Sequence, residues 1–288
     1  MKIVKTIAEL DKVLAPYRAK GQKIGFVPTM GALHEGHISL IDMARIENHI
    51  VVCSIFVNPT QFNDPKDLER YPRPLEDDER LLKKAGCDVL FIPLVQEMYP
   101  GGDYTTLDED FGNLDKVMEG KARPGHFAGM ITIVNKFFTA VKPHNAYFGS
   151  KDFQQLTIVK YFVHKHLLPL TIRPCPVIRE PDGLAMSSRN RLLSAEERKH
   201  ALLLSQTLFK VKDLWGAKPA ATLKQLVTES FAKDVFFRLD YFEIVYADTL
   251  AAVEEQVDST RPVIACIAAY NGNVRLIDNC MLTAGPGF

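Results

Sequence analysis

The hydrophobic pattern of the chain changes its period several times, and each change marks an expected element of secondary structure. Short apolar runs predict five strands, at residues 23–28, 50–57, 88–93, 146–148 and 170–178. Apolar residues recur with a helical period between them, at residues 38–45, 74–85, 130–141 and 151–166. Because strands that alternate with helices are joined by right-handed crossovers, we expect a doubly wound, mainly parallel α/β sheet of the Rossmann-like kind.

A different pattern follows the turn residues Pro181, Asp182 and Gly183. Two long helical stretches, at 194–215 and 219–231, precede three strand-like runs, at 240–246, 261–270 and 273–282. The last two runs flank Asn271-Gly272, a dipeptide that strongly favours a β-hairpin. We therefore expect two domains: residues 1–180 with the parallel sheet, and residues 181–288 as a smaller α+β cap with an antiparallel sheet.

The composition argues against several classes of protein. Lysine plus arginine equals aspartate plus glutamate, 35 against 35, so no global positive field attracts nucleic acid or an anionic membrane. No apolar run reaches the roughly 18 residues that a membrane span needs. Residues Thr6 to Glu9 form a Ser/Thr-x-x-Glu capping box, which opens a helix rather than a secretory signal. The five cysteines contain no C-x-x-C pair, which predicts reduced thiols and a cytoplasmic protein.

Residues with useful chemistry lie in loops that directly follow the predicted strands. In an open parallel sheet these loops converge at the carboxyl ends of the strands, where ligands bind. His34 and His37 follow the first strand at an expected helix start, where free N–H groups favour an anion, and Gly36 lets a ligand approach the backbone. Asn58 and Gln61 follow the second strand, and their amides suit a ligand that has hydroxyl and carboxylate groups.

Two further loops carry groups that bind nucleotides. Lys151 and Asp152 follow the fourth strand; the lysine offers a point charge to a phosphate, and the aspartate can accept from ribose hydroxyls. Ser187, Ser188 and Arg189 follow the fifth strand and suit the outer phosphates. Each loop alone is a common surface feature, but four such loops at one edge of one sheet predict a nucleotide site.

Other sites are less well supported by the sequence. Zincin helices place histidines at i and i+4, whereas His34 and His37 are three apart and lack a third ligand. The chain contains no P-loop, no dinucleotide-binding glycine pattern and no G-x-S-x-G elbow. Asp77 and Asp78 are candidate metal ligands, but we interpret them as acidic residues that complement the dipole of a helix at its first turn.

These loops resemble those of the pantoate–β-alanine ligase (pantothenate synthetase) family. That family belongs to a nucleotidyltransferase superfamily that shares its H-x-G-H element with class I aminoacyl-tRNA synthetases. The resemblance runs essentially end to end and rests on residues 28–37, 56–62, 71–73, 98–100, 123–127, 148–149, 151–152 and 186–190. The chain departs from the family at Ser150, where glutamate is common, and at Leu192, where tyrosine is frequent.

The resemblance implies ATP-dependent condensation of (R)-pantoate with β-alanine through a pantoyl adenylate, with release of AMP and pyrophosphate. It implies Mg²⁺ as cofactor and a homodimer as the assembly. The reaction needs no nucleophile from the enzyme; His37 would be the proton donor, and His34 and Lys151 would be further catalytic residues. Gln61 and Gln155 would hold pantoate, and Gln61 would also touch β-alanine. The implied ATP-binding residues are Met30, Gly31, Ala32, Leu33, His34, Glu35, Gly36, His37, Gly149, Ser150, Lys151, Asp152, Ile178, Met186, Ser187, Ser188 and Arg189.

Two alternatives stay open at this point. One is an adenylate-forming enzyme of the same superfamily that activates another acid, with an aminoacyl-tRNA synthetase as its weaker version because the neutral chain is poorly equipped for RNA. The other is a nucleotide-binding relative that has lost turnover.

Overall fold

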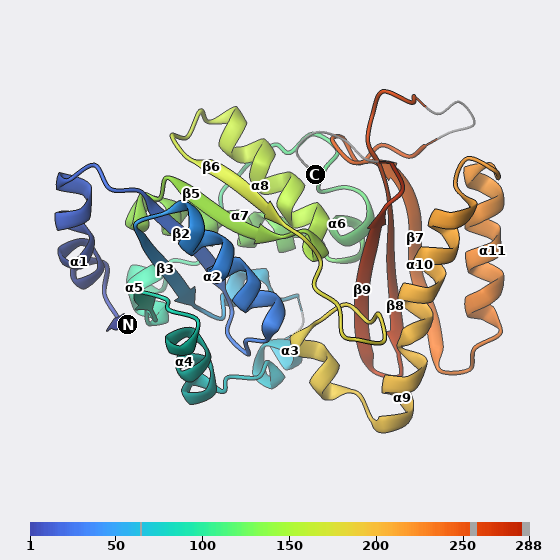
Figure 1. Cartoon of the computed structure of the whole chain (residues 1–288), viewed down its shortest axis with the longest axis horizontal. Coiled ribbons are helices and arrows are strands. Elements are labelled where there is room, and N and C mark those ends of the chain that lie inside the picture. Colours follow the sequence, from blue (N-terminus) through green and yellow to red (C-terminus); the bar gives the residue numbers. More distant parts are fainter. Residues whose placement is uncertain (64, 254–257, 284–288) are drawn as a thin grey trace.

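The structure is a computed structural model that describes residues 1–63, 65–253 and 258–283, and it contains two separate sheets (Figure 1). The first sheet has six parallel strands in the order β1-β4-β3-β2-β5-β6. Its strands are β1 (Lys2–Val4), β2 (Ile24–Thr29), β3 (Ile50–Ile55), β4 (Val89–Phe91), β5 (Asn145–Gly149) and β6 (Thr171–Cys175). The predicted α/β sheet is therefore confirmed, and it is wholly parallel.

Helices cover both faces of this sheet. They are α1 (Ile7–Ala19), α2 (Glu35–Glu47), α3 (Pro65–Arg70), α4 (Leu75–Lys84), α5 (Val95–Met98), α6 (Met118–Ala122), α7 (His126–Val141) and α8 (Phe153–Lys165). Successive residues of a strand point to opposite faces. Accordingly Phe26 and Val52 pack with α1, α7 and α8, whereas Val27 and Val51 pack with α2 and α4. Burial of both faces explains why these strands read as continuous apolar runs.

The second sheet has three antiparallel strands, β7 (Phe237–Tyr246), β8 (Val263–Asn271) and β9 (Val274–Met281). Helices α9 (Ala195–His200), α10 (Leu202–Leu214) and α11 (Ala220–Ala232) precede it, and α10 and α11 pack on one of its faces. Ile264 and Cys266 on the other face of β8 pack with the core of the first sheet. The predicted hairpin is confirmed, because β8 ends at Asn271 and Gly272 has a left-handed φ of 56°.

The elements that the sequence pattern did not predict are short. Strand β1 has three residues and pairs with β4 at the edge of the sheet, and α3, α5 and α6 have six, four and five residues. The predicted stretch 194–215 divides into α9 and α10 at Ala201. The capping box at the start of α1 is confirmed: the Glu9 N–H donates to Thr6 Oγ1, and the Thr6 N–H donates to the Glu9 carboxylate.

Two findings bear on the classes of protein considered above. All five cysteines are free thiols, four of them buried, as the unpatterned cysteine set predicted. Within the described ranges, no helix combines the length and the apolar character that crossing a bilayer requires.

Candidate active site

Two neighbouring strands of the first sheet, β2 and β5, separate at the point where the strand order reverses. The chain runs from β2 through β3 to β4 on one side and returns to β5 on the other side of β2. β2 pairs with β3 along all of Ile24–Thr29, but with β5 only at Gly25 and Phe26. The carboxyl ends of β2 and β5 therefore diverge, which leaves the crevice in which doubly wound sheets bind ligands.

A cavity of about 210 Å³ occupies this crevice. His37 from α2, Lys151 after β5 and Arg189 from the segment after β6 all line it, although they are far apart in the chain. The predicted site residues that line the cavity are Met30, His34, Gly36, His37, Gln61, Gly149, Lys151, Asp152, Gln155, Ile178, Met186, Ser187, Ser188 and Arg189. The structure thus brings the four loops together, as their positions after strands predicted.

Five predicted ATP-binding residues do not line this cavity. They are Gly31, Ala32, Leu33, Glu35 and Ser150. Ala32 and Leu33 are buried and their N–H groups already donate to a carboxylate, while the Glu35 side chain is exposed. The Ser150 carbonyl accepts a hydrogen bond from Asn279 Nδ2 of the second sheet. Contact of these five with ATP stays a prediction.

Asp78 holds the loop that leads to the two histidines. It lies in the first turn of α4 beside Asp77, as we interpreted, but its side chain is buried and accepts the N–H groups of Ala32 at 2.8 Å and Leu33 at 2.7 Å. These bonds stabilise a turn in which Gly31 and Ala32 both have positive φ, 81° and 50°. The sequence did not predict this role, because both aspartates have the same acidic neighbourhood and only the fold separates them.

The hydrogen bonds of His34 and His37 fix the tautomer of each ring. His34 Nδ1 accepts the N–H of Gly36 at 3.1 Å, and His37 Nδ1 accepts the N–H of His34 at 3.3 Å. A backbone N–H can only donate, so both Nδ1 atoms are unprotonated and the neutral rings carry their proton on Nε2. The ring centroids lie 4.1 Å apart. Both rings line the cavity, so two Nε2–H donors are available to an anion there.

Both rings are neutral at pH 7 in this arrangement. Burial, with the nearby charges of Lys151 and Arg191, lowers the pKa of His34 to about 4. Burial, and then the neighbouring His34 ring, holds the pKa of His37 well below its ordinary value. The positive charge of the cavity therefore comes from Lys151 and Arg189, and the histidines contribute hydrogen-bond donors.

Gln61 is held from both sides. Its side-chain Oε1 accepts from Asn58 Nδ2 at 3.2 Å, and its backbone carbonyl accepts from His126 Nδ1 at 2.8 Å. Gly129 of α7 packs against the backbone of Thr60 and Gln61, where a Cβ atom would clash. Its Nε2 contacts Met30 Sδ at 2.7 Å, so Gln61 lines the cavity from a rigid turn with both ends of its side-chain amide held by the protein.

A second cavity, of about 440 Å³, lies between the two sheets. It meets the first cavity at shared lining residues, which are Tyr71, Lys151, Asp152, Gln155, Ser187 and Arg189. The cavity that contains the histidines therefore adjoins a cleft between the sheets.

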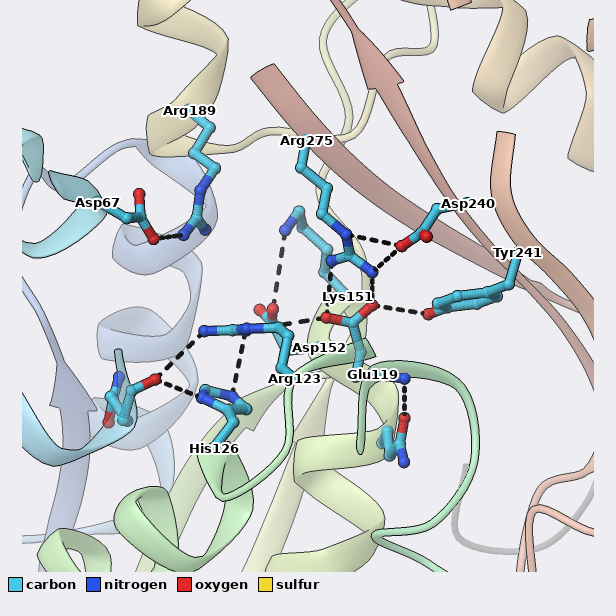
Figure 2. Close-up of polar contacts among 12 residues, drawn as sticks. Asp67, Glu119, Arg123, His126, Lys151, Asp152, Arg189, Asp240, Tyr241 and Arg275 are labelled. Carbon is cyan, nitrogen blue, oxygen red and sulfur yellow. Dashed lines mark hydrogen bonds and ion pairs between the residues drawn. The ribbon is translucent and has the colours of Figure 1, made fainter. Parts of the chain in front are cut away.

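Charged residues of α6 and of the second sheet meet in this cleft (Figure 2). Glu119 of α6 accepts from both terminal nitrogens of Arg275, at 2.8 and 2.7 Å, and from the Tyr241 hydroxyl at 2.9 Å. Arg123 lies 3.8 Å from Glu119 and donates to His126 Nε2 at 3.3 Å. Sequence reasoning assigned no role to these residues; 123–127 was noted only as a segment of the resemblance.

A wholly parallel sheet with a cavity of histidine, lysine and arginine at its reversal point is typical of enzymes that bind nucleotides. Comparison with known proteins specifies the class. A sequence model described as pantoate-beta-alanine ligase matches residues 2–281. The pantothenate synthetase of Bacteroides fragilis is 50% identical over 279 residues, which cover 97% of this chain and 98% of that protein. That of Thermotoga petrophila is 49% identical, with 98% and 100% covered.

Solved structures agree with the sequence comparison. Pantothenate synthetase from Thermus thermophilus has a TM-score of 0.91 at 42% identity, with 99% of this chain and 100% of that chain covered. Pantoate-beta-alanine ligase from Francisella tularensis, solved with beta-gamma ATP and beta-alanine, has a TM-score of 0.81 at 37% identity, with 99% of both chains covered. The chain belongs to the pantoate-beta-alanine ligase family. It is accordingly a ligase, with pantoate and β-alanine as its substrates.

Proposed function

We propose that the chain uses ATP to activate (R)-pantoate as pantoyl adenylate and then transfers the pantoyl group to β-alanine, releasing pyrophosphate and AMP. One observation carries the proposal: two neutral histidines, a lysine and a Ser-Ser-Arg turn line one cavity that also contains two glutamine side chains. The family relationship supports it, as does the Francisella tularensis relative solved with beta-gamma ATP and beta-alanine.

The first half-reaction joins pantoate to AMP. A carboxylate oxygen of pantoate attacks the α-phosphorus of ATP, and the bond from that phosphorus to the pyrophosphate oxygen breaks. The Nε2–H groups of His34 and His37 and the ammonium of Lys151 would stabilise the charge that grows on the α-phosphate, with His37 as the donor to it. Gln61 and Gln155 would hold pantoate, while Ser187, Ser188 and Arg189 would bind the outer phosphates.

The second half-reaction forms the amide. The amine of β-alanine attacks the carbonyl carbon of the adenylate, the bond to the AMP oxygen breaks, and the ammonium that forms loses its proton. We propose that β-alanine reaches Gln61 through the cleft between the sheets, because this cleft shares Tyr71 and Lys151 with the inner cavity. We propose that residues 1–180 and 181–288 are separate domains, and that the second protects the adenylate from water.

A magnesium ion would accompany ATP in this site. Magnesium is usually held by substrate phosphates and one or two carboxylates rather than by a dedicated cage. The donors fit that pattern: within the described residues no cluster of three histidine, cysteine or acidic side chains could hold a metal, and Asp152 lines both cavities. When bound, the ion would neutralise charge on the outer phosphates.

The decisive experiment is an analysis of products. Purified chain with ATP, Mg²⁺, pantoate and β-alanine is expected to give AMP in equal amount to pantothenate. ADP in place of AMP would contradict the adenylate route. Turnover with another acid in place of pantoate would favour an adenylate-forming enzyme of different specificity, and ATP binding without any product would favour a relative without turnover.

Two expectations about the setting of the enzyme also rest on the family. We propose that the chain is a homodimer and that it works in the cytoplasm. Sedimentation of the purified chain at catalytic concentrations measures the first, and a single species of 32.4 kDa would contradict it.

A further inference from the structure

Strand β9 turns one face toward the cleft. Residues two apart in a strand point the same way, so Arg275, Ile277 and Asn279 share a face, and all three line the cleft. Arg275 binds Glu119, as described above. Asn279 reaches a different part of the first sheet, the turn that carries Lys151.

The side-chain amide of Asn279 binds two successive carbonyl groups of that turn. Its Nδ2 donates to the Ser150 carbonyl at 2.9 Å and to the Lys151 carbonyl at 2.8 Å. Because carbonyl oxygens only accept, the nitrogen must face them, and both of its hydrogens are then used. Asn279 is 5% exposed, so these bonds form where water competes little.

Asn279 is itself held in place. The backbone carbonyl of Asn279 accepts from Arg179 Nη2 at 3.1 Å, and its backbone N–H donates to Asp278 Oδ1 at 2.7 Å. Arg179 and Asp278 also form an ion pair with nitrogen–oxygen distances of 2.7 and 3.0 Å. The strand position that reaches the Lys151 turn is thus anchored to the segment that follows β6.

Two bonded carbonyls fix two consecutive peptide planes, and so the direction in which the Lys151 side chain leaves the backbone. The side-chain ion pair of Lys151 is weaker, since its Nζ lies 3.8 Å from Asp152 Oδ1. We propose that Asn279 is a positioning residue: it aims Lys151 into the nucleotide cavity and so links the second sheet to the first half-reaction. This inference rests on the proposed role of Lys151.

Asn271 is a matched control within the same sheet. It is also a buried asparagine, and its Nδ2 donates to a backbone carbonyl, that of Glu197, at 2.6 Å. That bond stays within the part of the chain that contains the second sheet. If the only effect of these substitutions is a general loss of packing or stability in this part of the chain, Asn271→Ala should show it as strongly as Asn279→Ala.

The experiment measures each half-reaction separately in folded variants, with folding checked by circular dichroism. Pyrophosphate–ATP exchange with pantoate reports the first half-reaction, and pantothenate formation from supplied pantoyl adenylate and β-alanine reports the second. Asn279→Ala should slow the exchange by about tenfold to a hundredfold, the cost of a misplaced catalytic group. It should change the second reaction by less than about twofold. Asn279→Asp, which cannot donate, should slow the exchange similarly, and it replaces Asn279→Ala if that variant does not fold.

A double variant tests whether Asn279 acts through Lys151. If it does, Asn279→Ala in a Lys151→Ala background should slow the exchange no further. Losses that multiply would overturn the inference, and so would an Asn279→Ala exchange rate within about twofold of that of Asn271→Ala. If instead Lys151→Ala exchanges at the wild-type rate, Lys151 has no role in the first half-reaction, and both its part in the proposed function and this inference are wrong. If the exchange is slow in Lys151→Ala but normal in Asn279→Ala, only this inference is wrong.

Discussion

His34 and His37 form one histidine site beside the cavities and His126 forms another, and the two sites share lowered pKa values but differ in their hydrogen bonds. The pKa of His34 and that of His126 are both lowered to about 4, mainly by burial. His34 and His37 accept backbone N–H groups at Nδ1, and neither Nε2 has a hydrogen-bond partner among the residues that the structure describes. His126 donates from Nδ1 to the Gln61 carbonyl and accepts from Arg123 at Nε2.

This difference separates a ring that can act on a ligand from a ring that supports the wall of the site. The pair at the start of α2 has its proton-bearing nitrogens available in the cavity. Both nitrogens of His126 are used within the protein, where the ring holds Gln61 in place. A lowered pKa alone would have pointed to all three histidines, whereas the tautomers single out two.

Removal of His37 should have the largest effect. His37→Ala deletes one donor to the transition-state charge, so we expect kcat to fall by about a hundredfold to a thousandfold, roughly 3 to 4 kcal/mol. Far-UV circular dichroism should stay as in the wild type. Steady-state assays of AMP formation measure the effect, and turnover near that of the wild type would take His37 out of the mechanism.

Removal of His126 should act on stability and binding instead. His126→Ala removes the shorter of two hydrogen bonds to the Gln61 carbonyl, which then keeps only the bond from Arg123 Nη2 at 3.4 Å. We expect a cost of about 0.5 to 1.5 kcal/mol of the free energy of unfolding. The KM for pantoate should rise more than kcat falls, because the ring positions Gln61. His126→Asn keeps a donor near the position of Nδ1 and should recover part of both losses. A kcat loss as large as that of His37→Ala would erase the distinction between the two sites.

Acid should destabilise the protein through both histidine sites. The folded pKa of His34 and of His126 is about 4, below the ordinary value of 6.5, so the unfolded chain binds more protons between these values. The free energy of unfolding should therefore fall as the pH drops from 6.5 toward 4. Urea unfolding at several pH values measures this slope, which is at most about 1.4 kcal/mol per pH unit for each ring. His126→Asn should have a smaller slope; an equal slope would show that His126 does not contribute.

The sequence predicted the parallel sheet and the shared cavity well, since both follow from local patterns. The strands of a parallel sheet are buried on both faces and read as apolar runs, and their carboxyl ends converge whatever the details of packing. That is why His37, Lys151 and Arg189 could be placed together from their positions after strands alone.

The rest of the site depends on contacts between segments far apart in the chain. Asp78 and Asp77 differ only in which way the first turn of α4 faces the core, and the pattern gave no means to choose between them. The links from Arg275 to Glu119 and from Asn279 to Ser150 cross between two sheets, whose relative placement no local pattern encodes. Strand β1 was too short to stand out from its neighbours.

The tautomers of the histidines can be measured most directly by ¹⁵N nuclear magnetic resonance at pH 7, with signals assigned through histidine-to-glutamine variants. We predict that His34 and His37 are neutral with the proton on Nε2, that His126 has its proton on Nδ1, and that ATP with Mg²⁺ shifts only the first two. Protonated Nδ1 in His34 and His37, or an ATP shift confined to His126, would contradict the account.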